Sequence, residues 1–175
     1  MFYDKWPRET EHARFELVNH SFYHPECADA RFHNGVRETS FDPAFSSVYP
    51  LTTGKDDFKG DVLEFADYKF VLVVANNLFS DRIAALLAKG CVVLFVDNGY
   101  REWYYPALIP FVHYVPIKMD LTDLCAKLAL LKRNPEAAAT IAANGRAFIK
   151  DGLRVEDRDE YIAEVLRQWG ALWNR

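Results

Sequence analysis

The sequence predicts an α/β domain of the Rossmann-like type with a largely parallel sheet. Two valine-rich runs, residues 68–75 and 91–96, are apolar almost throughout. Such runs are typical of strands buried on both faces of a parallel sheet. The stretch between them has apolar residues at helical spacing and ends at Lys89-Gly90, a common helix C-terminus. A strand, a helix and a strand joined by short turns form a βαβ unit, whose two strands run parallel.

The elements around this unit are predicted from the same signals. Ser80 is expected to be the N-cap of the first helix, and Asp97-Asn98-Gly99 is expected to form a turn. Further along, the patterns predict a short helical turn at 101–105 ended by Pro106, a strand at 111–115, a helix capped by Asp120, a helix starting at Asn134-Pro135, and a last helix with an apolar stripe from Ile162 to Trp173.

The chain divides near residue 65. Residues 65–175 carry the regular patterns and are predicted to form the Rossmann-like domain. Residues 1–64 have scattered apolar positions and frequent Gly, Pro, Asp and His, and they are interpreted as an irregular remnant or linker. One strand is expected within them, at residues 14–18.

Composition narrows the class of protein. The 175 residues are 50% hydrophobic, which suffices for one well-packed domain, and the net charge of -4 offers no broad basic surface for a nucleic acid. The chain has no signal peptide pattern and no apolar stretch long enough to span a bilayer. Its three cysteines include no Cys-x-x-Cys pair and favour reduced thiols and a cytoplasmic location. The histidines near Cys27 fit no standard metal spacing, so no metal is expected.

Two loops are candidates for ligand binding, because parallel sheets bind ligands beyond the carboxyl ends of their strands. In loop 75–82, Ser80 stands at a helix N-terminus and Arg82 can grip two phosphate oxygens at once. Together they suit a diphosphate. The alternative is an ordinary capped helix with an arginine on its solvent face.

The second loop, 97–103, leads into an aromatic block. Arg101 could contact a phosphate, Glu102 could accept hydrogen bonds from ribose hydroxyls, and Tyr100 or Trp103 could stack on a base. The alternative is a short amphipathic helix that packs its aromatic side chains on the sheet.

The stretch from Tyr68 to about Tyr161 resembles the carboxyl-terminal half of glycosyltransferase family 90. That family includes protein O-glucosyltransferases, capsule-associated proteins and lipopolysaccharide glycosyltransferases. The resemblance rests on motifs in the same order along the chain: Tyr68 to Leu72, Ser80-x-Arg82, Leu86 to Leu94, Tyr100 to Leu108, Pro110 to Lys118, Asp120 to Leu124, Ile141 to Phe148, Glu156-Asp157 and Tyr161.

The resemblance implies a GT-B fold of two lobes, in which the carboxyl-terminal lobe binds a nucleotide sugar, usually a UDP-sugar. It places Ser80 and Arg82 at the diphosphate, and Tyr100 and Arg101, with Glu102 in the same motif, beside the donor. It implies no cofactor and no metal, and a glycan, lipopolysaccharide or protein acceptor. The family often has Asp-Gly after the first strand and Lys after the second, where this chain has Ala75-Asn76 and Phe95.

The family's amino-terminal lobe, which carries acceptor contacts and an aspartate base, has only about 65 residues to correspond to it here. Nothing in the sequence identifies Asp56 or Asp57 as that base. We therefore expect the donor-binding half of a glycosyltransferase that works with a separate amino-terminal lobe. The alternative is a non-catalytic remnant or fragment that keeps the fold and weak nucleotide binding.

Overall fold

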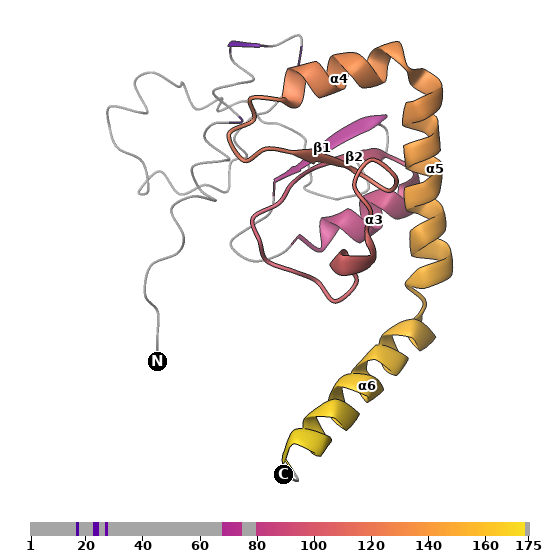
Figure 1. Ribbon diagram of the computed structural model, residues 1–175. Helices are drawn as coiled ribbons and strands as arrows, with labels where there is room; N and C mark the ends of the chain where they lie inside the picture. Colours follow the sequence, from indigo (N-terminus) through magenta and orange to yellow (C-terminus); the bar gives the residue numbers. More distant parts are fainter. Residues whose placement is uncertain (1–16, 18–22, 25–26, 28–67, 75–79, 174–175) are drawn as a thin grey trace, which may run out of the picture.

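The computed structural model describes residues 68–74 and 80–173, together with Leu17, Tyr23, His24 and Cys27 (Figure 1). A parallel three-stranded sheet lies at the centre of this part. Its strands β1 (Phe70–Val74), β2 (Val92–Val96) and β3 (Val115–Ile117) are ordered β1-β2-β3. The predicted mixed α/β class and the parallel pairing of the first two strands are confirmed, with Phe70 opposite Val92 and Leu94 opposite Val115.

The sheet is buried on both faces. Helix α3 (Arg82–Lys89) and the 3-10 helix η3 (Tyr105–Ala107) cover one face, and helix α4 (Leu124–Arg133) covers the other. All five residues of β2 are buried and alternate between the two sides: Val93 and Phe95 pack toward α3, while Leu94 packs toward α4. Each such side chain contributes about 1.5–3 kcal/mol when fully buried, so β2 is the centre of the core.

Helix α5 (Pro135–Gly152) packs against α3, α4 and the central strand β2, and it begins, as predicted, with Pro135 at its first position. It touches both sides of the core through Ile141 and Phe148. Its close approach to α3 depends on Gly145, where an added Cβ would lie 2.7 Å from Leu87 Cδ2 and 2.8 Å from the His113 carbonyl oxygen. This contact explains a glycine within a helix, where it would otherwise be unfavourable.

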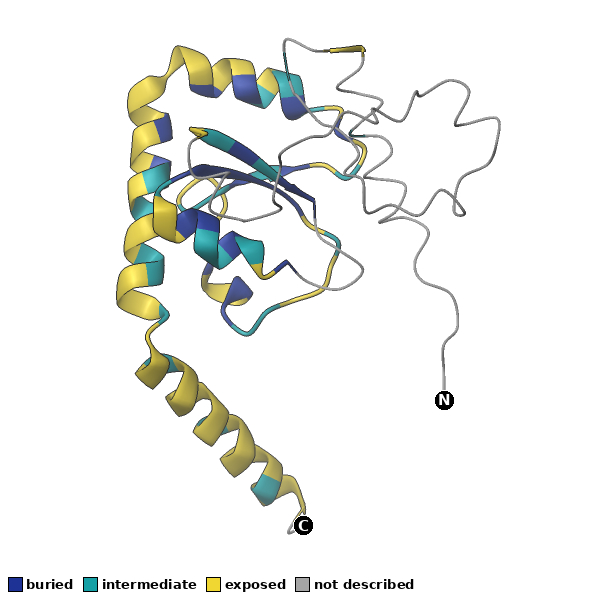
Figure 2. Ribbon diagram, turned by 180° about the vertical axis from the view of Figure 1, so that it is seen from behind, coloured by how far each residue is buried: buried dark blue, intermediate teal, exposed yellow. Residues whose placement is uncertain are grey.

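Helix α6 (Val155–Trp173) extends away from the domain in Figure 1. The apolar stripe predicted for it is present, but no residue of this helix is buried, and Figure 2 shows its surface as almost wholly exposed. Among the described residues, the structure therefore gives this stripe no packing partner comparable to the core of the domain.

Helix starts differ from the predicted ones. Asp81, not Ser80, is the N-cap of α3, and Asp123, not Asp120, is the N-cap of α4. Asp120 instead caps a turn, accepting hydrogen bonds from the Thr122 N–H (3.1 Å) and hydroxyl (2.8 Å). The side chain of Asp120 is thus used in this turn, whereas the backbone of Ser80 is held by a distant side chain described below.

The predicted strand at 111–115 is wrong for most of its length. Phe111 has a left-handed backbone (φ 61), which an extended strand does not allow, and His113 Nδ1 accepts a hydrogen bond from the Ile109 N–H at 3.0 Å. The strand begins at Val115 and continues through Pro116, a residue tolerated there because β3 is an edge strand. Likewise, Pro106 lies inside η3 and does not end a turn before it.

The expectation of reduced cysteines is also wrong. Cys27 and Cys125 form a disulfide with a Cα–Cα distance of 5.3 Å, across 98 positions of the sequence. Spacing along the chain could not reveal the pair, because only the fold brings residue 27 beside α4. Cys91 lies outside this disulfide, and burial raises the pKa of its thiol.

The strand expected at 14–18 falls outside the described residues except for Leu17, which has a helical conformation and packs against the core. The division at residue 64 also lies outside the described part and stays a prediction.

Candidate functional site

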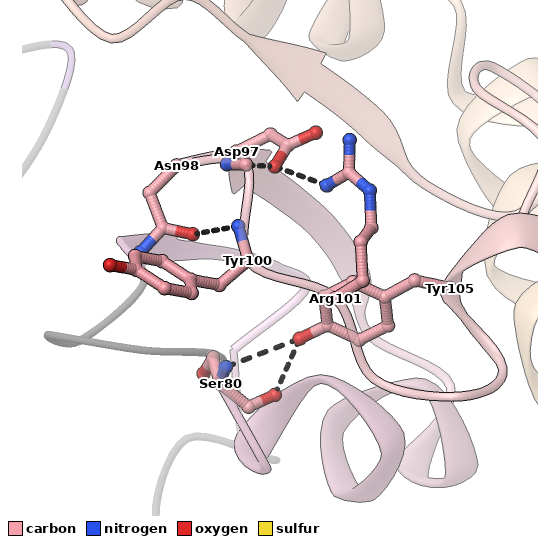
Figure 3. A network of polar contacts seen from close by, with 7 residues as sticks. Ser80, Asp97, Asn98, Tyr100, Arg101 and Tyr105 are labelled. Atoms are coloured by element: carbon pink, nitrogen blue, oxygen red, sulfur yellow. Dashed lines mark hydrogen bonds and ion pairs between the residues drawn. The ribbon is translucent and has the colours of Figure 1, made fainter.

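The candidate site lies at the edge of the sheet where the strands end. Because the strands are parallel, Val74 and Val96 leave the sheet at the same edge. Ser80 and the first turn of α3 follow β1 in sequence, and the segment from Asp97 to Tyr105 follows β2. Figure 3 shows the two segments joined by hydrogen bonds between Tyr105 and Ser80, with a second group of polar contacts among Asp97, Asn98, Tyr100 and Arg101 beside them.

Tyr105 joins the two segments. Its hydroxyl accepts a hydrogen bond from the Ser80 N–H at 3.2 Å and donates one to the Ser80 carbonyl oxygen at 2.9 Å (Figure 3). Burial raises the pKa of Tyr105 to about 12, so the hydroxyl keeps its proton and can donate at physiological pH. The start of α3 is therefore fixed to the segment that follows β2.

The Ser80 hydroxyl is the second feature of this edge. Ser80 is fully buried, and its Oγ has no hydrogen-bond partner among the described residues. A buried hydroxyl without a partner is costly and calls for an explanation. It lies just ahead of the N-terminus of α3, where no side chain caps the helix and where backbone N–H groups favour an anion.

The turn after β2 orients Arg101. Asp97 Oδ1 accepts hydrogen bonds from the Gly99 N–H at 2.8 Å and from Arg101 Nη1 at 2.5 Å, while the Tyr100 N–H donates to Asn98 Oδ1 at 3.2 Å. Gly99 takes a left-handed backbone (φ 87), which glycine allows at no steric cost. The predicted turn at Asp97–Gly99 is confirmed.

Asp97 and Arg101 shift each other's pKa. Burial raises the pKa of Asp97, but the hydrogen bonds from Arg101 and the Gly99 N–H outweigh it, and the pKa lies below its ordinary value. The Asp97 hydrogen bond raises the pKa of Arg101. The pair is ionised near neutral pH, and its side chains are 37% and 51% exposed, so a ligand can reach Arg101.

Three of the five predicted site residues take part in these polar contacts at the ends of the strands: Ser80, Tyr100 and Arg101 (Figure 3). Arg82 is the first residue of α3 and donates from Nη2 to the Val74 carbonyl oxygen at 3.3 Å, at the carboxyl end of β1. Glu102 accepts a hydrogen bond from the Tyr105 N–H through its backbone carbonyl oxygen at 3.0 Å, in the same turn. Whether Arg82 and Arg101 can share one diphosphate stays a prediction.

The aromatic block serves two purposes. Tyr104 and Tyr105 are buried against the sheet, and Trp103 contacts Tyr161 of α6 with ring centroids 5.3 Å apart. These residues agree with the alternative interpretation of this segment, in which its aromatic side chains pack inside the protein. Tyr100 does not, because it is 39% exposed and only its backbone N–H joins the polar contacts, by donating to Asn98 Oδ1 (Figure 3).

Two residues of the site are absent from the sequence-based candidates, Asp97 and Tyr105. Asp97 was assigned only to a turn, although its position four residues before Arg101 allows the ion pair seen here. Tyr105 stands in the block that carries the family resemblance, but its contact with Ser80 spans 25 positions and has no local sequence signal.

The described residues contain no group of three or more His, Cys, Asp or Glu side chains placed to hold a metal ion. None of the described helices combines the length and the apolar character needed to cross a membrane.

An α/β domain with polar side chains gathered where its parallel strands end is the class of protein defined so far, and comparison with known proteins makes it specific. The model of glycosyl transferase family 90 matches residues 3–174. The chain therefore belongs to glycosyltransferase family 90.

The relatives include protein O-glucosyltransferases. Human protein O-glucosyltransferase 3 is 32% identical over 162 residues, which are 93% of this chain and 30% of that protein. Human protein O-glucosyltransferase 1 is 27% identical over 165 residues, 91% of this chain and 39% of that protein. An uncharacterized protein, 035R, of invertebrate iridescent virus 3 is also 27% identical, with 15% of it covered. The chain thus spans well under half the length of these relatives.

Proposed function

We propose that this chain is the donor-binding part of a family 90 glycosyltransferase of the GT-B type, and that it binds the UDP of a UDP-sugar at the carboxyl edge of its sheet. The observation that carries the proposal is the buried, unpartnered Ser80 hydroxyl at the start of α3. The Tyr105 hydroxyl hydrogen-bonds to the Ser80 backbone and holds it beside the segment that bears Arg101.

Each residue has a role in the proposal. Ser80 and Arg82 bind the diphosphate, helped by the N-terminal N–H groups of α3. Arg101, oriented by Asp97, supplies a second guanidinium. Tyr100 stacks on the base and Glu102 accepts a hydrogen bond from the ribose. Cationic side chains and a helix end would stabilise the charge that grows on the leaving diphosphate, so the proposal needs no metal or other cofactor.

The names of the relatives point to glucose and to a protein. We therefore propose UDP-glucose as the donor and a protein as the acceptor, ahead of a glycan or a lipopolysaccharide. The rival function is a remnant that keeps the fold without transfer activity. The two human relatives are matched over 39% and 30% of their length, so their activity is carried to this chain only as a proposal.

The disulfide changes the proposed location. Disulfides persist in oxidising compartments and are rare in the cytosol. Because Cys27 and Cys125 are joined, we propose an oxidising compartment in place of the cytoplasm expected from the cysteine count.

Calorimetry with UDP tests the binding site. We expect a dissociation constant of roughly 0.1–1 mM, because the contacts that the resemblance assigns to an amino-terminal lobe are worth several kcal/mol and each 1.4 kcal/mol is about tenfold. Arg82→Ala should weaken binding by about 1.5–3 kcal/mol, and Arg133→Ala, on the far end of α4, should not. Inorganic phosphate is the control ligand. An absence of heat with millimolar UDP would favour the remnant.

Release of UDP from UDP-glucose tests catalysis. The chain alone should show no transfer above background, because the resemblance places the base and the acceptor contacts in the other lobe. The assay is run with and without a co-expressed amino-terminal lobe. Turnover by the chain alone at about 1 per second or more would mean that residues 1–64 supply a base, and Asp56 and Asp57 would be the first to mutate.

A further inference from the structure

A pocket of about 590 Å³ lies between the end of α3 and the second half of α5. We call it the α3–α5 pocket. Two further alanines of α5 complete a lining that consists mainly of Lys89, Gly90, Arg146, Ala147, Lys150 and Asp151. A cavity of this volume is within the range of small-molecule sites.

The α3–α5 pocket is separate from the candidate donor site. Lys89 is the last residue of α3, whereas Arg82 is its first. Because a helix rises about 1.5 Å per residue, the two ends of this eight-residue helix are about 12 Å apart. Gly90 leads into the amino end of β2, so the pocket lies toward the sheet edge opposite to the one that bears Ser80 and Arg101 (Figure 1).

The charge of the pocket is opposite to that of the whole chain. Lys89, Arg146 and Lys150 bring three positive charges and Asp151 one negative charge, which gives a local charge of +2 in a chain of net charge -4. Among the described residues, none of the three cations forms an ion pair or a side-chain hydrogen bond. Their charge is therefore available to a ligand.

Arg146 is the cation that a structural role does not explain. Lys89 and Lys150 lie in the last turns of α3 and α5, where a cation is favourable on any helix. Arg146 stands four residues before Lys150, and like charges at this spacing destabilise a helix. Its aliphatic stem runs beside Gly90, where an added Cβ would lie 3.8 Å from Arg146 Cδ. An anion bound between Arg146 and Lys150 would relieve their repulsion.

The lining also selects the class of ligand. Lysine and arginine bind phosphate oxygens, and the small side chains of Gly90 and the alanines let a ligand approach closely. Asp151 would repel a second phosphate, but its carboxylate accepts hydrogen bonds from hydroxyl groups. None of the described aromatic side chains lines the pocket, so a nucleobase has nothing to stack on.

We propose that the α3–α5 pocket binds a phosphorylated sugar or polyol, with the phosphate between Arg146 and Lys150 and a hydroxyl group on Asp151. Lys89 supplies a third positive charge from α3. This ligand differs from the proposed donor because it carries no base, and the inference does not rest on nucleotide binding.

Calorimetry of the full chain with glucose-6-phosphate tests the proposal. We expect saturable binding at millimolar concentrations, which glucose itself should not show. Arg146→Glu combined with Lys150→Glu should weaken binding at least about tenfold, because two charged hydrogen bonds are lost. Lys132→Glu combined with Arg133→Glu, on exposed residues of α4, changes the net charge equally and should weaken binding less than about twofold, because salt screens distant charges.

Two further variants test the position of the ligand. Asp151→Asn should lower the affinity for glucose-6-phosphate, relative to that for inorganic phosphate, by about fivefold, because a neutral acceptor replaces a charged one. Arg101→Ala should bind glucose-6-phosphate as the wild type does, because Arg101 lies at the other edge of the sheet. Equal midpoints in urea unfolding would show that all of these variants are folded.

Vesicles of phosphatidylcholine with phosphatidylinositol phosphate distinguish the two sources of such a ligand. Binding that the Arg146→Glu, Lys150→Glu variant abolishes would assign the pocket to a lipid headgroup, and binding of glucose-6-phosphate without vesicle binding would assign it to a free sugar phosphate. Three outcomes would overturn the proposal: no binding of either probe, an equal loss in the two double variants, or a loss in Arg101→Ala. A failure of UDP to bind would leave all of these results unaffected.

Discussion

The two halves of the candidate site are built differently. Ser80 and Tyr105 are buried, and the Tyr105 hydroxyl hydrogen-bonds to the backbone N–H and carbonyl oxygen of Ser80, 25 positions away. Asp97 and Arg101 are partly exposed and form an ion pair within one turn of chain. An unsatisfied buried polar group costs about 1–3 kcal/mol, whereas an exposed ion pair contributes about 0–1 kcal/mol. The first half should therefore support the fold and the site together, and the second half only the site.

Tyr105→Phe should have the largest effect. Loss of the hydroxyl removes the partner of the buried Ser80 N–H and leaves the Ser80 carbonyl oxygen only the Ile83 N–H at 3.4 Å, so the free energy of unfolding should fall by about 1–3 kcal/mol. Urea denaturation measures this. Tyr100→Phe is the matched control, because Tyr100 is 39% exposed, and its curve should overlay the wild type. Equal curves for Tyr105→Phe and wild type would mean that the buried half does not support the fold.

Arg101→Ala should separate binding from stability. If Arg101 contacts the diphosphate, UDP affinity should fall by about 1.5 kcal/mol, or roughly tenfold. The free energy of unfolding should change by less than about 1 kcal/mol, because the lost ion pair is exposed. Calorimetry and urea denaturation of the same preparation give both numbers. A large loss of stability with unchanged UDP affinity would mean that Arg101 supports the fold and not the binding site.

Ser80→Ala sharpens the comparison within the buried half. The Oγ has no partner among the described residues, so its removal should raise the free energy of unfolding by up to about 1–3 kcal/mol, the cost of an unsatisfied buried hydroxyl. UDP affinity should fall by about 0.5–1.5 kcal/mol, the contribution of one hydrogen bond. A variant that unfolds much more easily would show instead that the hydroxyl has a structural partner in the native protein.

The pH dependence of the exposed half should be the smallest effect. The pKa of Asp97 is lower in the folded protein than its ordinary value of 3.8, so its contribution to stability is present above that value. It is lost as the pH falls through the folded pKa. Asp97→Asn should therefore be less stable than wild type at pH 6 by up to about 1 kcal/mol. The difference should shrink toward pH 2.5 in urea denaturation. A constant difference across this range would indicate that the Asp97 charge does not stabilise the fold.

Local patterns in the sequence predict the βαβ unit, the helices after it and the turn at Asp97–Gly99 well. The two valine-rich strands and the end of α3 at Gly90 depend on residues close in sequence, and the structure has these elements where the sequence predicts them. The failures involve distant partners or unusual backbone. The positive φ of Phe111 displaces the third strand toward Val115, and the hydrogen bonds between Tyr105 and Ser80 move the helix start by one residue.

The disulfide also determines what happens when the chain is cut by a protease. The bond between Cys27 and Cys125 closes a ring that contains β1, α3, β2 and β3, along with both halves of the candidate site. A ring that is opened once is still a single connected molecule. A protease that cuts one peptide bond between these cysteines would therefore release no fragment until a reductant is added. Every piece of such a nicked protein would remain attached to the sheet edge on which the proposed donor site depends.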